Sequence, residues 1–303
     1  MAETEQKSAV KQEKKPLTKA QKLKRNRARR AYLRAGIQAV FFLLAPALFT
    51  SAFSGIKNIF TKIGAGQVLE LNSFVIVLLA LCGFTVVFGR FFCGYACAFG
   101  SLGDLFYWLS GLVQKKLGHK LPRIPEKLRR LLSYLPYVVL LAIVVLCALG
   151  IYGGLSGWSP WDVFSMLTAL RLHLGGYAVG IVLLVLVVVG MAFESRFFCR
   201  FLCPMGAVFR LLPILPWSVL RRNRETCLKG CTACEKACPV ETKLSSGCNA
   251  GDCIQCGKCL GACPKANCSA GLPKVRGNEL WLTAGKAVLL LLLAVLIGAS
   301  RIG

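Results

Sequence analysis

Phe91–Gly100 reads FFCGYACAFG, Phe197–Gly206 reads FFCRFLCPMG, and both stretches follow directly on a long apolar segment. Their counterpart positions lie 106 residues apart. The aligned cysteines are Cys93 with Cys199 and Cys97 with Cys203. The chain therefore carries an internal repeat, and each copy has two cysteines four residues apart where a hydrophobic segment ends.

Hydrophobic residues make up 55% of the 303 residues and the mean hydropathy is +0.60, which is more than a soluble core requires. Five segments are each long enough to cross a hydrocarbon core, which takes about 20 helical residues. They are Ala35–Ile56, Leu71–Gly89, Leu131–Trp161, Leu174–Phe193 and Leu280–Ser300. Pro46 and Pro136 are compatible with packed membrane helices. The composition predicts a mainly α, multi-pass helical membrane bundle.

Basic residues are unevenly distributed between these segments. Residues 1–34 contain 12 Lys and Arg, residues 114–130 contain 7 and residues 194–276 contain 13. The second connection has only Lys57 and Lys62, and the fourth only Arg171. The positive-inside rule places the N-terminus and the cysteine-rich region in the cytoplasm, and five spans put the C-terminus outside. Most of the +25 net charge then faces membrane lipid, and no nucleic-acid partner is expected.

Two tandem cysteine runs follow the second repeat. Residues 253–264, CIQCGKCLGACP, form a C-x2-C-x2-C-x3-C-P run, and residues 227–239, CLKGCTACEKACP, form the same run with one extra residue. In two-cluster bacterial ferredoxins the fourth cysteine of each run ligates the other cluster. The predicted ligands of cluster 1 are Cys253, Cys256, Cys259 and Cys238. Those of cluster 2 are Cys227, Cys231, Cys234 and Cys263.

Alternatives exist for these cysteines. A reducing cytoplasm argues against a disulfide framework. Zinc also binds paired cysteines, although the third cysteine and the cysteine–proline ending favour [4Fe–4S] clusters. Cys248 and Cys268 fit neither run and are predicted to be spare thiols. Cys248 is an alternative to Cys227, whose spacing is irregular.

The four repeated cysteines form a second candidate site. Two like-oriented hairpins related by a pseudo-two-fold axis would bring the cysteines to one depth, and residues i and i+4 share a helix face. Cys93, Cys97, Cys199 and Cys203 could then hold a third iron–sulfur centre or another metal, cycle as dithiols, or simply pack. Cys82 and Cys147, each alone in an apolar segment, are predicted to be packing residues.

The sequence lacks the binding motifs of other cofactor classes. No Cys-x-x-Cys-His occurs, which excludes covalent c-type haem, and no glycine-rich nucleotide motif occurs. His119 and His173 are predicted to be surface residues. Two tryptophans in Tyr152–Asp162 suit an aromatic belt, with a quinone or partner contact as the alternative.

Four domains are expected. They are a basic, disordered cytoplasmic tail (1–30), a four-helix membrane domain with the internal repeat (31–216), a double [4Fe–4S] ferredoxin-like region (217–278) and a C-terminal membrane helix (279–303).

The order of tail, two hairpins, repeated C-x3-C and double ferredoxin run resembles the NapH/NosR-type membrane polyferredoxins over roughly Arg30–Cys268. The resemblance implies a bacterial inner-membrane protein that carries two [4Fe–4S] clusters on the double run and redox-active C-x3-C motifs. Members of that family serve periplasmic nitrate and nitrous-oxide respiration, or stand beside flavin-binding systems. Three departures are Ala98 in place of proline, the irregular spacing after Cys227 and the fifth apolar segment.

The sequence therefore predicts an electron-transfer subunit rather than a stand-alone enzyme. Its expected partners are the quinone pool or a cytoplasmic carrier, and a membrane or extracytoplasmic flavin- or metal-containing redox protein. The alternative is an assembly factor that supplies electrons or thiols to a respiratory metalloenzyme. A zinc-binding membrane scaffold is a weaker alternative.

Overall fold

The computed structural model describes residues 18–118, 124–168, 176–215, 220–222, 227–228, 230–242, 251–265, 267–270 and 279–299. Cys248, His119, His173 and residues 1–17 lie outside the described residues, so the predictions for them remain predictions. Within those ranges the fold consists of helices and one two-stranded antiparallel sheet.

The elements of the first half are α1 (Lys19–Leu44), α2 (Leu48–Gly64), α3 (Ser73–Phe88), α4 (Phe91–Tyr95), α5 (Ala98–Leu117), α6 (Glu126–Leu132) and α7 (Leu135–Ala148). Those that follow are the 3-10 helix η1 (Tyr152–Trp158), α8 (Pro160–Thr168), α9 (Ala178–Phe193), α10 (Phe197–Phe201) and α11 (Pro204–Leu211). The cysteine-rich region and the C-terminal end contribute β1 (Leu220–Arg222), α12 (Ala233–Lys236), α13 (Lys258–Ala262), β2 (Cys268–Ala270) and α14 (Glu279–Leu296).

The first apolar segment is not one straight helix. α1 ends at Leu44 and α2 begins at Leu48, with a bend of 59° between them. Pro46 lies in the break, where it lacks the N–H that would continue the helical ladder. α1 also starts earlier than expected, because Thr18 and Gln21 form a capping box. Residues 19–30, predicted to be disordered tail, are therefore helical.

The 106-residue repeat is visible in the secondary structure. α4 and α10 have five residues each, and they are followed by α5 and α11, which begin at the matched positions Ala98 and Pro204. The two turns are the same, because the N–H of Cys97 donates to Phe92 and that of Cys203 to Phe198, both at 2.9 Å. Ala98 therefore starts its helix where Pro204 does, so the missing proline does not alter the helix ending. An axis relating whole hairpins remains a prediction.

The five-span count is not confirmed. Three helical stretches among the described residues are long and apolar enough to cross a membrane, namely Phe91–Leu117, Glu126–Ala148 and Glu279–Leu296, and the bent α1–α2 pair is a possible fourth. α3 and α9, expected to span alone, have 16 residues each and are shorter than the about 20 residues that a hydrocarbon core takes. The first cysteine pair follows the end of α3 at Phe88, as expected, and it also lies at the start of the apolar helical stretch Phe91–Leu117.

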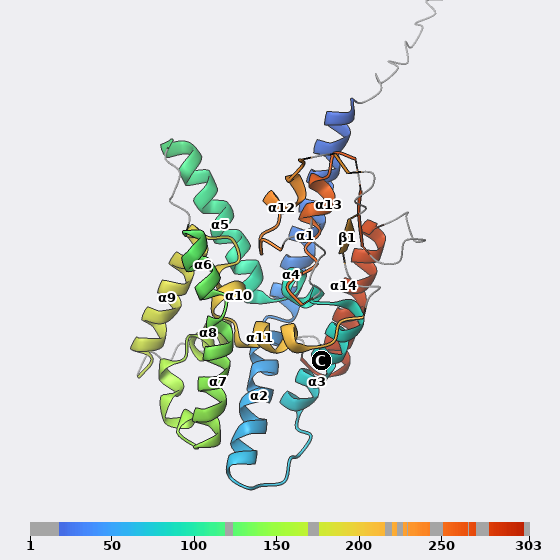
Figure 1. Cartoon of the computed structure of the whole chain (residues 1–303). Helices are drawn as coiled ribbons and strands as arrows, with labels where there is room; N and C mark the ends of the chain where they lie inside the picture. Colours follow the sequence, from blue (N-terminus) through green and yellow to red (C-terminus); the bar gives the residue numbers. More distant parts are fainter. Residues whose placement is uncertain are drawn as a thin grey trace, which may run out of the picture.

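Figure 1 places the two ends of the bundle. The cysteine-rich elements α12, α13 and β1 lie at the upper end beside the start of α1, and the far ends of α2 and α7 lie at the lower end. Between these levels lie α4, α10 and α11. An aromatic core joins the repeats, with the rings of Phe99 and Phe198 stacked at 4.5 Å and Phe49 edge-on to both.

Candidate iron–sulfur sites

The four membrane cysteines occupy equivalent positions in the two repeats. Cys93 lies in α4 and Cys199 in α10, whereas Cys97 and Cys203 are the N-cap residues of α5 and α11. Each is at most 6% exposed. Each thiol of Cys97, Cys199 and Cys203 lies within electrostatic range of a thiol from the other repeat. The structure thus brings together the four residues that the repeat predicted.

This geometry corrects the expectation that the two cysteines of each pair share one helix face. A turn separates the two cysteines of each pair, so they do not share the face of one continuous helix. Cys203 Sγ accepts a hydrogen bond from the N–H of Gly206 at 3.2 Å. A thiolate at the N-terminus of a helix is stabilised by the unpaired N–H groups there, which suits a metal ligand.

Two buried arginines accompany the cysteines. Arg90 and Arg196 are both 1% exposed, and one guanidinium nitrogen of each lies 3.9 Å from Sγ of the first cysteine in its own repeat. Arg196 also crosses to the first repeat, where Nη1 donates to the carbonyl of Cys93 at 2.5 Å. A Cβ on Gly100 would lie 2.3 Å from Arg196 Nη1, so glycine is needed where this guanidinium passes.

The charge around the cysteines is positive. Asp104 on α5 pairs with Arg196 at 2.5 Å and with Arg34 of α1. Arg90 pairs with no carboxylate among the described residues and donates to the carbonyl of Gly251 at 2.9 Å. Buried guanidiniums therefore outnumber carboxylates here, and an anionic centre would offset the excess.

The arrangement of these donors bears on which metal group they could hold. Among the described residues, no group of three or more His, Cys, Asp or Glu is arranged for a single metal ion. A four-iron cluster needs its thiolates further apart than one tetrahedral ion does. The buried Nε atoms of Arg90 and Arg196 have no hydrogen-bond partner in the part of the chain that the structure describes, and the sulfurs of a cluster would accept from them. The residues therefore fit an iron–sulfur centre.

The cysteines predicted for cluster 1 also come together. Cys238, at the end of the first run, lies within electrostatic range of Cys253 and Cys256, and Cys259 lies within range of all three. Burial, together with the neighbouring Cys256 and Cys253 thiols, raises the pKa of Cys259 well above its ordinary value. Iron binding favours the thiolate that burial disfavours.

The cluster 2 cysteines are arranged differently from expectation. Cys234 packs with Cys268 and with Cys259 of cluster 1 in a small buried core, against which Cys263 lies. Cys227 Sγ accepts a hydrogen bond from Arg222 at 2.8 Å. Cys231 is partly exposed. The unexpected member is Cys268, which was predicted to be a spare thiol.

The second cysteine run is docked on the first repeat. Gly94 on α4 faces the carbonyl of Ile254 so closely that a Cβ there would lie 2.2 Å from its oxygen. Tyr95 donates its hydroxyl to the carbonyl of Cys256 at 3.3 Å. On α14, Lys286 donates to Gln255 at 3.1 Å, which gives the one charged residue of the last apolar segment a role.

The end of the first run is docked on the second repeat. Ser195 donates to the carbonyl of Pro239 at 3.3 Å, and Arg200 on α10 pairs with Glu241 at 2.8 Å. Although burial opposes ionisation, Arg200 and Arg129 hold the pKa of Glu241 below its ordinary value. Each membrane cysteine pair is thus covered by a loop from the cysteine runs.

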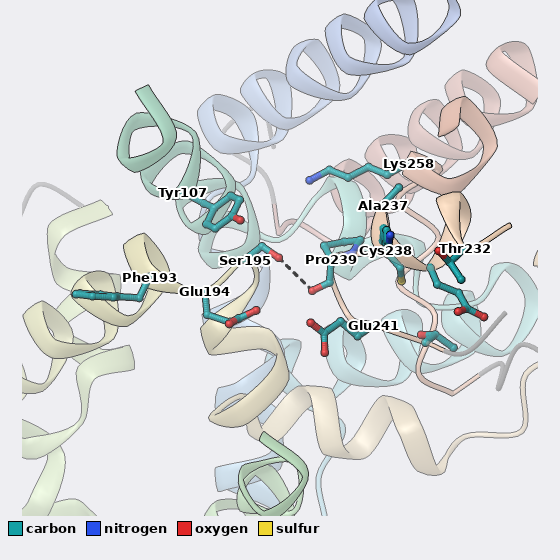
Figure 2. A pocket seen from close by; sticks show the side chains of 13 residues that line it. Tyr107, Phe193, Glu194, Ser195, Thr232, Ala237, Cys238, Pro239, Glu241 and Lys258 are labelled. Carbon is teal, nitrogen blue, oxygen red and sulfur yellow. Dashed lines mark hydrogen bonds between the residues drawn. The ribbon is translucent and has the colours of Figure 1, made fainter. Parts of the chain in front are cut away.

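A cleft of about 620 Å³ opens beside this second contact. Figure 2 shows Tyr107 of α5 and Glu194 across from Cys238 and Lys258. The volume lies in the range of small-molecule sites. The cleft therefore offers access to a cysteine predicted to ligate cluster 1.

Sequence reasoning did not assign a role to Arg90, Arg196 or Asp104. The signal was available for the arginines, because they match at the same offset of 106 and border apolar segments. Asp104 has no matching residue in the second repeat that would have singled it out from the sequence. Only the fold brings it to Arg34.

Comparison with known proteins supports an iron–sulfur protein. A family model described as a 4Fe-4S binding domain matches residues 73–120 and 177–222, which contain the two repeats and both membrane cysteine pairs. A protein of Methanocaldococcus jannaschii whose name assigns no function is 33% identical over 75% of this chain and 88% of its own length. No solved structure matches the chain significantly.

Two further relatives have more informative names. YccM of Escherichia coli, named provisionally as an electron transport protein, is 25% identical over 71% of this chain and 60% of YccM. The protein NirI of Paracoccus denitrificans is 30% identical over 57% of this chain and 25% of NirI.

Proposed function

The chain belongs to the family of NapH/NosR-type membrane polyferredoxins, and on that premise we propose that it relays electrons between a quinol or cytoplasmic donor and a membrane or extracytoplasmic redox partner. It is a membrane protein of the iron–sulfur electron-transfer class. Its clusters, when bound, each accept and pass on one electron at a time. The described residues bind, orient and shield those centres.

One observation carries the proposal. The loop of the second cysteine run lies directly on the turn that bears the first membrane cysteine pair, through the Gly94–Ile254 and Tyr95–Cys256 contacts. Ile254 is 1% exposed. A close, dry contact between two cysteine sites is what stepwise electron transfer needs, and a zinc-binding membrane scaffold would have no need of it.

We further propose a third iron–sulfur centre at Cys93, Cys97, Cys199 and Cys203. Support comes from their burial, from the unpartnered Nε atoms of the two arginines and from the family match over both repeats. Positive charge beside such a centre favours its reduced state and raises its potential.

An order of centres follows from the contacts. Cluster 1 would lie next to the membrane cysteines, since Gly94 and Tyr95 touch its loop, and cluster 2 would lie further out. The cleft beside Cys238 would admit a cytoplasmic carrier or a small redox molecule to cluster 1. A quinone and an extracytoplasmic flavin or metal partner remain proposals that rest on the family.

The orientation is proposed on charge. Lys and Arg are concentrated in the segments next to the cysteine-rich region, which lies at the opposite end of the bundle from the far ends of α2 and α7. The cysteine-rich region would therefore face the cytoplasm in the cytoplasmic membrane. Since one relative is archaeal, a bacterial source remains an expectation.

Iron analysis tests the proposal. Protein purified without oxygen should contain iron and sulfide and give EPR signals after reduction, whereas zinc without iron would overturn it. Changing Cys93 and Cys199 together to serine should lower iron per chain while the ferredoxin signals persist. Unchanged iron with lost electron transfer would make the pairs dithiols, and unchanged behaviour would make them packing residues. Intact clusters that a quinol and an acceptor cannot turn over would favour the assembly-factor alternative.

A further inference from the structure

Cys268 occupies a defined place among the cluster 2 cysteines. It opens β2, which pairs antiparallel with β1 so that Arg222 is directly opposite Cys268. Residues directly opposite in an antiparallel pair project from the same face. The Cys268 side chain therefore lies on the face from which the Arg222 guanidinium extends, and it is only 5% exposed.

The neighbours of Cys268 come from both cysteine groups. Cys234 and Cys268 belong to one buried core with Cys259 of the first group, and Cys253 and Cys263 pack against it. The direct hydrogen bond of Cys268 is to the second group. The thiol of Cys268 is hydrogen-bonded to that of Cys263 and within electrostatic range of Cys234. The Cys263 sulfur accepts a further bond from the N–H of Asn267 at 3.2 Å, which ties it to the residue before Cys268.

Cys227 is held differently. Its sulfur lies 2.8 Å from Arg222 Nη2, while Nη1 of the same guanidinium lies 3.7 Å from Cys234 Sγ. Cys227 is less buried than Cys234 and Cys268. The extra residue of its run, Cys227 to Cys231, lengthens the spacing that other ferredoxin runs use. Arg222 thus stands between Cys227 and the buried sulfurs.

We propose that Cys268, rather than Cys227, supplies the fourth thiolate of cluster 2 together with Cys231, Cys234 and Cys263. Arg222 keeps Cys227 beside the cluster as a charge-assisted hydrogen-bond acceptor. On ligation an S–H bond of Cys268 breaks, an Fe–S bond forms and the proton leaves to water, with no change in oxidation state. The inference rests on the proposed function, because it presupposes that the double run binds [4Fe–4S] clusters.

Three single variants of the full chain test it, each purified without oxygen in detergent. Cys268→Ala should lose about four irons per chain, one cluster's worth, and one set of EPR signals. Cys227→Ala should keep the iron content of the wild type. Cys82→Ala on α3, outside all proposed sites, is the matched control for loss of a thiol.

Cys268→Ser distinguishes loss of a cluster ligand from a folding defect, because an alkoxide can replace a thiolate as ligand. It should retain more iron than Cys268→Ala but shift the cluster 2 EPR signal, which a merely structural thiol would not do. Full iron in Cys268→Ala, or an equal loss in Cys227→Ala, overturns the assignment. Wild-type protein without iron–sulfur clusters would instead overturn the proposed function.

Discussion

Gly94 is the point at which the cysteine-rich region touches the membrane repeat most closely. We consider Gly94→Ala. The added Cβ would lie 2.2 Å from the Ile254 carbonyl oxygen and 3.5 Å from the Cys256 N atom. Because ordinary contact begins at 3.4 Å, the loop must retreat by about 1.2 Å, and backbone on both sides leaves no flexible side chain to yield.

The magnitude follows from two opposing effects. Replacing glycine by alanine within a helix contributes about 0.5–1 kcal/mol of stability, whereas forced overpacking costs about 1–3 kcal/mol. Gly111→Ala on α5 has the first effect alone, because nothing lies within 4 Å of its Cβ. The two variants should therefore differ by about 1–3 kcal/mol in the stability of the docked state.

The assay is thermal loss of the cluster absorbance in detergent, with wild type and both variants measured side by side. Gly94→Ala should lose its clusters at a lower temperature than wild type, and Gly111→Ala should match or exceed wild type. If the two variants behave alike, the loop does not rest on α4 and the contact that carries the proposed electron path is wrong.

Three further predictions concern charge and metal. Arg90→Gln should lower the potential of the proposed membrane centre in an EPR redox titration, because a buried positive charge is lost, whereas exposed Arg130→Gln should not. The ionised Glu241 stabilises its loop fully above about pH 4.5, and this stability is lost as the pH falls through the lowered pKa. Cluster stability followed against pH should lose that acid step in Glu241→Gln, and persistence of the step would point to another carboxylate. Chelation of iron should expose residues 227–263 to protease before the membrane helices, because the iron that orders the loops is removed. Simultaneous cleavage would contradict this.

Much of the local structure was predictable from the chain. Two apolar segments ended near the expected residues, α3 at Phe88 and α9 at Phe193, because hydrophobic composition is a local property. The segment Leu131–Trp161 did not, since α7 ends at Ala148. The offset of 106 predicted equivalent places for Cys97 and Cys203, and their backbone hydrogen bonds do match, although a turn replaces the continuous helix that the i, i+4 argument assumed. The break at Pro46 was misjudged, because whether a proline bends or breaks a membrane helix depends on its neighbours.

Cysteine spacing by itself determined the chemistry, because a ligand run encodes its cluster locally. Only the tertiary structure decided which groups meet. Arg196 crosses to the carbonyl of Cys93, 103 positions away, and β1 pairs with β2 to bring Cys268 beside Cys234. Such contacts depend on how helices pack and loops dock, and their energies depend on burial that no single segment specifies.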